Sequence, residues 1–397
     1  MRIVSSTGVR MIAGADTCCP AWSPDGHWLG FISGSDNELW ITRADGTHRR
    51  MLATGVDSFA WSPRSDRLAL QAKSGLQLVD LDASEPATIT LAAASSSFAW
   101  SPDGLRLAVS ATVATTYRDQ LRIYSLPAPG TSCRSRQSCA RIGPPIDLGA
   151  IGGPHFFVRI ADWRPDGAAL VAWVESLETN GRLDAAPLLL VPLDGRRPQL
   201  LDYMVVQPDW VRWSPDGAHL ALITGTGRFV LDPRRLTVCT ASGRCDTLTP
   251  ATEQARDPEW SPDGRSVLYT VIDQAEALRL ASTRPPANWP SLFAHRELWR
   301  VALDGGHRAR VARVAAGVGA PSFTSDASRL LVVHGRELEQ LDLRTGAAVS
   351  VAPLVENAST DPYWTSPHAL PDDHPYEGVE AGPGGWHKWF AVQPSPA

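Results

Sequence analysis

The sequence predicts an all-β protein made of repeated four-stranded antiparallel sheets, and three observations lead to this prediction. The string Trp-Ser-Pro-Asp-Gly occurs four times without change, beginning at Trp22, Trp100, Trp213 and Trp260. Strand-like apolar segments follow each copy at similar distances. Asp-Gly pairs, a strong signal for tight hairpins, recur between later segments. Together these features predict a β-propeller, in which four-stranded blades repeat around a central channel.

Weaker copies of the string extend the repeat over the chain. They begin at Trp61, Trp163, Phe323 and Trp364, which brings the number of repeat anchors to eight. Successive anchors lie 39, 39, 63, 50, 47, 63 and 41 residues apart. The shortest spacings are close to the ~40–45 residues of one propeller blade. The sequence therefore predicts a single propeller domain over residues 1–397, with longer connections where the spacing grows.

The first repeat shows how each blade is expected to form. After the turn that follows Trp22 come an apolar strand at Trp28–Ile32, a polar loop and a second strand at Glu38–Ile41. An Asp45-Gly46 turn then leads to a closing strand at Arg49–Leu52. With the strand that ends at the anchor, this makes four strands, here called a, b, c and d.

The repeated string has a structural explanation. Proline at the second position of a turn presets φ, serine and aspartate suit its first and third positions, and glycine closes it. The preceding tryptophan ends strand a and supplies a large apolar side chain for the gap between neighbouring blades. The string is therefore expected to hold blades together.

These repeats resemble those of the TolB-like, WD-repeat-like β-propellers, whose blades carry the same Trp-Ser-Pro-Asp-Gly turn. The resemblance covers nearly the whole chain, although TolB's N-terminal α/β domain has no counterpart here, nor has any hydrolase domain. It implies a propeller fold and says less about function, because the repeat occurs in interaction scaffolds, in the propeller domains of prolyl oligopeptidases and in sugar-acid lyases.

The two ends of the chain bear on the number of blades. Residues 2–12 have the pattern of strands c and d before any anchor, whereas Trp364 and residues 389–392 have the pattern of strands a and b. Joined, they form one blade, so that no sheet edge stays open. We expect eight blades; seven is the alternative, because residues 366–385 are rich in proline, glycine and histidine.

Composition limits the class of partner. The formal net charge of -5 leaves no basic surplus for a nucleic-acid backbone, and no apolar run is long enough to span a membrane. No motif for a cofactor is found, and no Gly-x-Ser-x-Gly, His-Glu-x-x-His or phosphate-binding loop occurs. We expect a monomer that binds a protein or peptide and neither nucleic acid nor a membrane.

Candidate binding residues lie in the longer loops, which are expected to share one face because b–c and d–a loops emerge together. These loops are predicted at 111–120, 149–158, 175–187 and 273–296. Long loops on a rigid scaffold commonly carry binding residues. The alternative is that their aromatic residues cover the loops as small local cores. The candidates for contact with a partner are Tyr117, Arg118, His155, Phe156, Trp289 and His295.

Four carboxylates stand just before anchors and form a second candidate group: Asp57, Asp209, Asp257 and Asp361. If they converge at the mouth of the channel, they provide oxygen ligands for a cation or attract a basic peptide. The alternative is that each caps nearby backbone, because alternation along a strand points neighbouring residues to opposite faces. We expect no bound metal.

Six cysteines include two pairs of equal spacing, Cys133 with Cys139 and Cys239 with Cys245. Each pair brackets a predicted c–d turn, so each is expected to close a disulfide across a hairpin. Zinc binding is the alternative, but the spacing does not match that of zinc sites. Disulfides favour an export compartment such as the periplasm, whereas the first residues lack a secretory signal, so the compartment stays open.

Two functions remain. The first is a non-catalytic scaffold that binds a protein or peptide across the face with the long loops. The second is a propeller enzyme, a lyase or hydrolase acting on a sugar or peptide at the channel mouth. An enzyme needs at least two catalytic groups within reach of one reacting atom.

Overall fold

The structure is a computed structural model that describes residues 2–5, 8–11, 17–43, 45–64, 67–81, 87–92, 95, 97–127, 140–148, 151, 155–176, 185–225, 232–282, 296–304, 306–311, 318–324, 328–334 and 337–353. The chain forms two compact units. Within the described residues, the first unit comprises the chain up to Ser176 together with Leu189–Pro198, and the second comprises residues 185–188 and 199–353.

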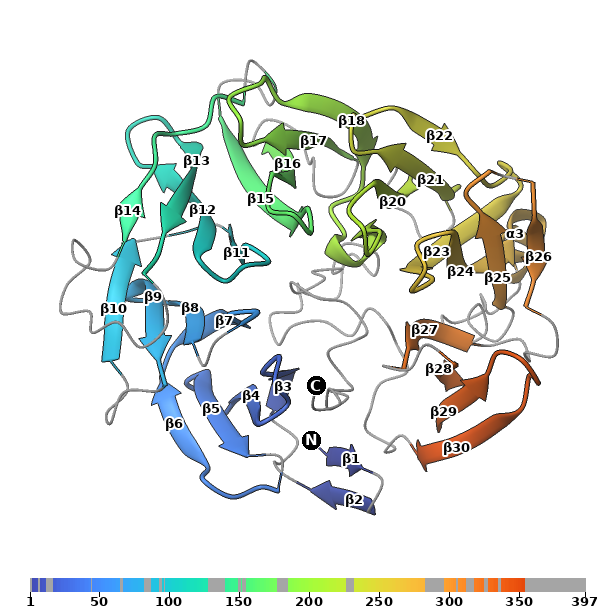
Figure 1. Cartoon of the computed structure of the whole chain (residues 1–397), viewed down its shortest axis with the longest axis horizontal. Coiled ribbons are helices and arrows are strands. Elements are labelled where there is room, and N and C mark those ends of the chain that lie inside the picture. Colours follow the sequence, from blue (N-terminus) through green and yellow to red (C-terminus); the bar gives the residue numbers. More distant parts are fainter. Residues whose placement is uncertain are drawn as a thin grey trace. The chain divides into compact units, whose positions relative to one another are not determined.

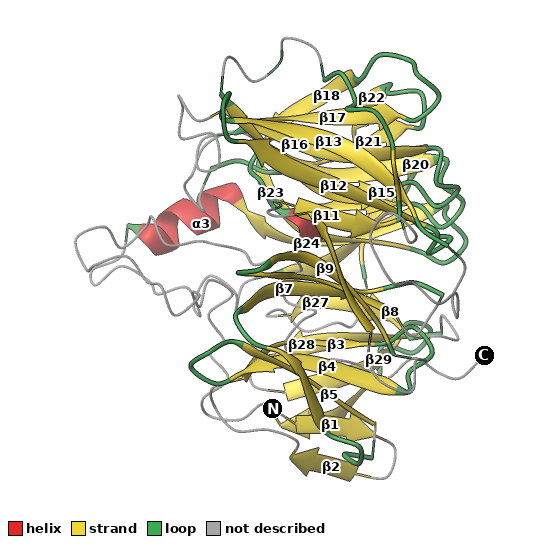
Figure 2. Ribbon diagram, turned by 90° about the vertical axis from the view of Figure 1, so that its left-hand side faces the viewer, coloured by secondary structure: helices red, strands yellow, loops and turns green. Residues whose placement is uncertain are grey.

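Strands make up nearly all of the regular structure (Figures 1 and 2). Those of the first unit are β1 (Arg2–Ser5), β2 (Gly8–Met11), β3 (Thr17–Trp22), β4 (Trp28–Ser33), β5 (Glu38–Arg43), β6 (Arg50–Ala53), β7 (Val56–Trp61), β8 (Arg67–Ala72), β9 (Gly75–Asp80), β10 (Ala87–Ala92), β11 (Ser97–Trp100), β12 (Arg106–Val113), β13 (Arg118–Ser125), β14 (Arg141–Ile142), β15 (Phe156–Trp163) and β16 (Ala169–Ser176). Strand β17 (Ala186–Pro192) has residues in both units.

The second unit continues the same pattern. Its elements are β18 (Gln199–Met204), the 3-10 helix η1 (Pro208–Trp210), β19 (Val211–Trp213), β20 (His219–Thr224), β21 (Arg235–Thr240), β22 (Cys245–Thr247), β23 (Glu253–Trp260), β24 (Ser266–Asp273), α3 (Gln274–Ala281), β25 (Glu297–Ala302), β26 (Arg308–Arg310), β27 (Val318–Phe323), β28 (Arg329–His334), β29 (Glu337–Asp342) and β30 (Ala348–Pro353).

Each run of four successive strands forms an antiparallel meander, as the sequence predicts. Among the described residues, five sheets have four strands: β3–β6, β7–β10, β19–β22, β23–β26 and β27–β30. Strands β11–β18 form one larger sheet, because a parallel bridge between Arg118 and Phe156 joins β13 to β15. Strands β1 and β2 pair with each other. The prediction of four-stranded antiparallel sheets is thus confirmed, and the number of blades stays a prediction.

Four of the anchor tryptophans each donate a hydrogen bond to the preceding sheet. The acceptor in each case is the backbone carbonyl of the residue just before the preceding anchor. The pairs of indole Nε1 and carbonyl oxygen are Trp61 with Ala21 (2.9 Å), Trp100 with Ala60 (3.1 Å), Trp163 with Ala99 (3.1 Å) and Trp260 with Arg212 (2.8 Å). These four indoles are also buried. The anchor therefore joins sheets through both packing and a directed hydrogen bond.

The Ser-Pro-Asp-Gly turns are closed by a fixed set of hydrogen bonds. In the turn after Trp100, the Ser101 hydroxyl donates to the Asp103 carboxylate (2.5 Å) and accepts the Arg106 backbone N–H (2.9 Å). The same carboxylate accepts the Leu105 N–H at 3.0 Å. The equivalent bonds recur in the turns that begin at Ser23, Ser214 and Ser261. The repeated string is thus a repeated hydrogen-bond network.

These hydrogen bonds stabilise the ionised aspartates of the turns. The Ser214 hydroxyl and the Ala218 backbone N–H lower the pKa of the Asp216 carboxyl. The Ser261 hydroxyl and the Arg265 N–H do the same for Asp263. A carboxylate that accepts several hydrogen bonds holds its proton less tightly. Each sheet has two ends at which its strands are connected. We call the end that carries these turns the anchor edge, and the opposite end, where the second and third strands connect, the loop edge.

A bulge interrupts the first strand of several sheets shortly before the anchor. The register between neighbouring strands shifts between Cys18 and Ala21 in β3 and between Arg256 and Glu259 in β23. Cys19 has φ +60° and Asp257 has φ +51°, a left-handed conformation uncommon outside glycine. A bulge adds one residue and so changes which face the following side chains occupy.

The hydrophobic core is a series of layers between consecutive sheets. One layer combines Trp28 and Leu39 of the sheet β3–β6 with Trp61 and Leu70 of β7–β10. Equivalent layers lie farther along the first unit, and a further layer in the second unit combines β24, β25, β28 and β29. No helix in the described part of the chain is long and apolar enough to cross a membrane.

Two long connections differ from expectation. Residues 111–120, predicted as a loop, largely extend strands β12 and β13, which pair up to Val113 and Arg118 and leave a four-residue turn. The predicted loop 273–296 begins with a helix, α3, whose first turn is capped by the Asp273 carboxylate accepting the Glu276 N–H at 3.0 Å (Figure 2). Trp289 and His295 lie outside the described residues.

Candidate functional site

Four of the predicted binding residues come together at the loop edge of the first unit. Tyr117 ends the β12–β13 turn, and His155 directly precedes β15. Their rings meet edge to face, with centroids 6.2 Å apart and planes at 74°. The Arg118 guanidinium carbon lies 5.1 Å from the centre of the Phe156 ring, within the range of a cation–π contact. We call these four residues the aromatic cluster.

The backbone around this cluster is held by hydrogen bonds. The Val113 carbonyl accepts the N–H groups of Thr116 (3.0 Å) and Tyr117 (2.9 Å). Tyr117 has φ +51°, a conformation that a non-glycine residue keeps only when its surroundings fix it. The turn therefore fixes the backbone from which the tyrosine side chain extends.

A buried carboxylate joins the strands beneath the cluster. Asp119 accepts hydrogen bonds from the hydroxyls of Ser110 (2.9 Å) and Thr112 (2.6 Å) and from the Val158 backbone N–H (2.8 Å). Only 4% of Asp119 is exposed. Because these bonds connect β12, β13 and β15, they fix the two loops that carry the cluster relative to each other.

The four residues differ in exposure. Phe156 is buried and belongs to the core between β11–β13 and β15–β17. Tyr117 is 62% exposed, whereas His155 and Arg118 are half-buried. The cluster thus presents a phenol and an imidazole to solvent above a packed guanidinium–aromatic pair. Tyrosine and arginine are over-represented among the residues that dominate binding energy at interfaces.

The predicted carboxylates occupy different surroundings. Asp57 is exposed. Asp209 pairs with Arg212 at 2.8 Å, and Asp257 pairs with Arg296 at 3.4 Å and accepts the Thr270 hydroxyl at 2.6 Å. The fourth, Asp361, lies outside the described residues.

In the described part of the chain, no three His, Cys, Asp or Glu side chains are arranged to hold a metal ion. Instead, arginine side chains accompany both Asp209 and Asp257.

The sequence analysis identified neither these two arginines nor two others, Arg234 and Arg256. Arg234 and Arg256 are almost fully buried and lie over the same tryptophan, Trp210, with guanidinium carbons 5.5 and 5.2 Å from its ring centroid. The sequence offered only their positions, because Arg234 and Arg296 directly precede the third strand of their sheets and Arg256 lies in a first strand. No motif distinguishes them from the other arginines of the chain.

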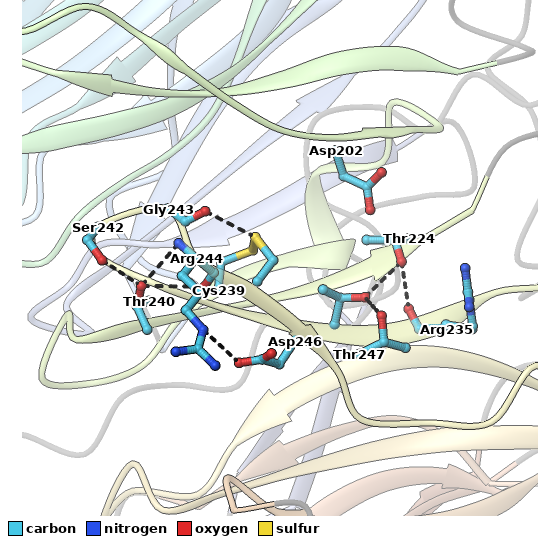
Figure 3. Close-up of a disulfide and its surroundings, with 12 residues drawn as sticks. Asp202, Thr224, Arg235, Cys239, Thr240, Ser242, Gly243, Arg244, Asp246 and Thr247 are labelled. Atoms are coloured by element: carbon cyan, nitrogen blue, oxygen red, sulfur yellow. Dashed lines mark hydrogen bonds and ion pairs between the residues drawn. A yellow bond between two sulfur atoms is a disulfide. The ribbon is translucent and has the colours of Figure 1, made fainter.

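One predicted disulfide is present at the anchor edge of the second unit (Figure 3). Cys239 of β21 and Cys245 of β22 are direct partners in the hairpin register and are joined through their sulfur atoms. The turn between them is closed by Thr240, whose N–H donates to the Arg244 carbonyl at 2.7 Å. Cys133 and Cys139 lie outside the described residues.

Comparison with known proteins identifies the fold. A scan against models of protein families and a search of curated proteins both find no match. Among solved structures, the tricorn protease is similar with a TM-score of 0.52 and 13% identity; the match covers 88% of this chain but 41% of that protein. The likeness therefore concerns the fold alone.

Two other similar structures are an oligogalacturonate lyase in complex with manganese and a putative TolB from Agrobacterium tumefaciens. The lyase has a TM-score of 0.49 and 13% identity over 93% of this chain and 85% of its own. The TolB structure has a TM-score of 0.35 and 18% identity over 64% of this chain and 79% of its own. All three neighbours are β-propeller proteins.

Proposed function

We propose that the chain is a non-catalytic, TolB-like propeller scaffold that binds a protein or peptide through its loop edge. The observation that carries the proposal is the aromatic cluster, in which an exposed tyrosine is held beside His155 in a fixed backbone conformation. The resemblance to TolB-like proteins rests on the repeated Trp-Ser-Pro-Asp-Gly turns.

The cluster suits a peptide for three physical reasons. A tyrosine ring offers a large contact area with little loss of conformational entropy and a hydroxyl that donates or accepts a hydrogen bond. The neighbouring imidazole of His155 adds a polar group that meets backbone amides. The bonds of Asp119 hold both loops before a partner arrives, which lowers the entropic cost of binding.

A peptide selection tests this function. Peptides selected from a random library on the wild-type protein are measured by calorimetry against Tyr117→Ala and His155→Ala. We expect a loss of affinity of about tenfold or more for Tyr117→Ala, as for a typical interface hot spot. The control is Tyr203→Ala, because Tyr203 is also a largely exposed tyrosine, at 49%, but lies on β18.

Selected peptides that bind Tyr117→Ala and His155→Ala as well as the wild type overturn the proposal. So does turnover of a sugar polymer or peptide by the purified protein, which favours the alternative of a propeller enzyme. Circular dichroism of each variant verifies that the loss is not one of folding.

We further propose that the chain forms one propeller of eight blades, with residues 2–11 contributing outer strands to the last blade. The pairing of β1 with β2 supports this, because the two strands form an antiparallel hairpin like that of strands c and d. Deletion of residues 1–11 is expected to lower the midpoint of thermal unfolding. An unchanged midpoint contradicts the closure and favours seven blades.

We also propose that the protein works in an oxidising compartment such as the periplasm, as a monomer. The Cys239–Cys245 disulfide supports the first point. Titration of thiols in the unfolded, unreduced protein is expected to find fewer than six. Six reactive thiols would exclude the disulfides, and light scattering tests the monomer.

A further inference from the structure

Two arginines at the anchor edge of the first sheet lie over the same tryptophan. The guanidinium carbon of Arg43 is 3.9 Å from the centroid of the Trp28 ring, and that of Arg50 is 5.5 Å from it. Both distances are within the range of a cation–π contact. Arg43 ends β5 and Arg50 begins β6, so one hairpin turn brings both to Trp28, the first residue of β4. We call these three residues the arginine stack.

The register of the sheet explains why these side chains meet. Trp28 is the direct partner of Arg43, and Ile41, two residues before Arg43, is the direct partner of Arg50. Cross-strand partners share a face of the sheet, as do alternate residues of one strand. Trp28 and Ile41 pack on that face against the sheet β7–β10. The two guanidinium groups therefore lie at the anchor end of this core layer.

Neither guanidinium group of the arginine stack meets an anion. Within the described residues, no ion pair and no side-chain hydrogen bond involves Arg43 or Arg50. The Nε atom of Arg50 is buried and makes no hydrogen bond. Both residues are only half-buried, so their other nitrogen atoms can reach a ligand from solvent. The stack thus brings two positive charges to one ring without a counterion from this part of the chain.

The described acidic side chains at the anchor edge of the first two sheets have other partners. These contacts are Asp25 with His27 (3.1 Å), Asp80 with Arg67 (3.2 Å) and Asp45 with the Thr47 backbone N–H (2.8 Å). The ion pair of Arg67 and Asp80 is instructive, because these residues begin β8 and end β9 and so occupy the register position that Trp28 and Arg43 occupy in the first sheet. The first sheet therefore has a tryptophan and an arginine where the next sheet has a balanced ion pair.

Arginines that lie over tryptophans in two other sheets are completed by oxygen acceptors. Arg106 lies 5.1 Å from the Trp163 ring centroid and donates to the Gly167 carbonyl at 2.9 Å. Arg308 lies 4.1 Å from the Trp299 ring centroid and pairs with the Glu253 carboxylate. In both cases the ring contacts the guanidinium group while its N–H groups meet an oxygen atom. The arginine stack has the ring and lacks the oxygen.

We propose that the arginine stack binds a phosphate group, either as free phosphate or as the monoester of a larger ligand. A guanidinium group is a planar fork of five N–H donors, which suits phosphate oxygens better than a point charge does. Two guanidinium groups match the two negative charges of a phosphate, whereas a carboxylate neutralises only one of them. The site lies at the anchor edge and does not depend on the aromatic cluster at the loop edge.

Three probes test the proposal by calorimetry on the whole protein at pH 7.5 and constant ionic strength: inorganic phosphate, glycerol 3-phosphate and acetate. We expect at least one of the two phosphates to bind, and acetate to bind at least about tenfold more weakly because it lacks the second charge. Tighter binding of inorganic phosphate identifies the free ion as the ligand. Tighter binding of glycerol 3-phosphate identifies a phosphate monoester, and equal binding shows that only the phosphate group is recognised.

Substitution of the two arginines distinguishes a ligand contact from general attraction by positive charge. Arg43→Gln and Arg50→Gln are each expected to lower the affinity for the bound phosphate about tenfold. Arg196→Gln serves as the matched control, because it removes the same charge at an exposed position in a turn of another sheet. Arg43→Lys keeps the charge and removes the planar fork, so it is expected to lower the affinity as well.

Thermal unfolding gives a second measurement that a purely structural role would not change. A ligand that binds only the folded protein raises the midpoint of unfolding. Phosphate is therefore expected to raise the midpoint of the wild type and of Arg196→Gln, and to leave that of Arg50→Gln unchanged. The midpoint of each variant without phosphate verifies that it is folded.

Three results overturn the proposal: no binding of either phosphate, binding of acetate as tight as that of phosphate, or equal affinities of Arg43→Gln and Arg196→Gln. If Arg43→Gln fails to fold, Arg43→Lys decides, and wild-type affinity in this variant refutes the site. Tyr117→Ala is expected to leave phosphate binding unchanged, which separates this test from that of peptide binding.

Discussion

The anchor edge and the loop edge of the same sheets are constructed in opposite ways. At the anchor edge, four turns repeat one hydrogen-bond network, in which a serine hydroxyl bridges an aspartate and a backbone N–H. At the loop edge, the side chains differ: the first unit presents the exposed aromatic cluster, whereas the second buries Arg234 and Arg256 over Trp210. Uniform geometry thus accompanies a structural role, whereas departure from the repeat marks the places where a ligand can be recognised.

The comparison implies that substitutions in the repeated string act on stability and those at the loop edge act on binding. The largest effect is expected for Trp100→Ala, because Trp100 is buried and its indole donates to the Ala60 carbonyl of the preceding sheet. The variant should lose about 3–5 kcal/mol of unfolding free energy in urea. Trp100→Phe, which keeps the ring packing but not the N–H, should lose less. If Trp100→Ala loses less unfolding free energy than Tyr117→Ala, the contrast between the anchor edge and the loop edge is wrong.

The next effect concerns Glu259, which directly precedes an anchor and is half-buried. Burial raises its pKa to about 7, opposed by Arg212 and by a hydrogen bond from the Phe323 backbone N–H. Because the folded state favours the protonated form, this group stabilises the protein below pH 4.5, and the contribution is lost as the pH rises through 7. Relative to Glu259→Gln, the wild type should lose on the order of 3 kcal/mol between pH 5 and pH 8. Urea unfolding at both pH values measures this, and parallel curves for the two proteins contradict it.

Two aspartates of the loop edge sharpen the comparison. Asp257 is paired with Arg296 and hydrogen-bonded by Thr270, so Asp257→Asn, which tolerates φ +51°, should cost about 2 kcal/mol. Asp57→Asn, at an exposed position, should change stability by less than about 0.5 kcal/mol. Chemical denaturation compares them, and equal losses would mean that the arginine contact contributes nothing.

A further effect, smaller than that of Asp257→Asn, is expected at one anchor turn. The pKa of Asp216 is lowered by the Ser214 hydroxyl and the Ala218 N–H. The stability that the ionised Asp216 carboxylate contributes is present above pH 4 and is lost as the pH falls through the pKa of Asp216 in the folded state. Asp216→Asn should lower the unfolding free energy by on the order of 1 kcal/mol at pH 7. It should also make the unfolding free energy less dependent on pH in the acidic range. A variant that keeps the wild-type acid dependence shows that the turn does not depend on this charge.

Sequence alone predicted the anchor edge well, because its interactions are local. Ser101, Asp103 and Arg106 lie within six residues, so the string itself contains the hydrogen-bonded groups. The pairing of Cys239 with Cys245 was predictable for the same reason, since a single hairpin brings them together.

The loop edge was predicted only in part. Tyr117 and His155 were predicted as binding residues because they lie in long loops, but the contact between their rings depends on the bridge between β13 and β15. Arg234 and Arg256 were missed because strands from different sheets bring them to Trp210. The bulge between Arg256 and Glu259, which alternation along the strand does not predict, changes which face the residues after it occupy.

The hydrogen bond between successive anchors has a consequence for how such a chain can grow. The repeats anchored at Trp61 and Trp100 each contain both the indole donor that contacts the preceding sheet and the carbonyl acceptor that receives the following one. A repeat duplicated in frame therefore meets a fitting surface on both sides. New copies can be gained or lost in evolution without a new interface, while the connections at the opposite side are left to diverge independently.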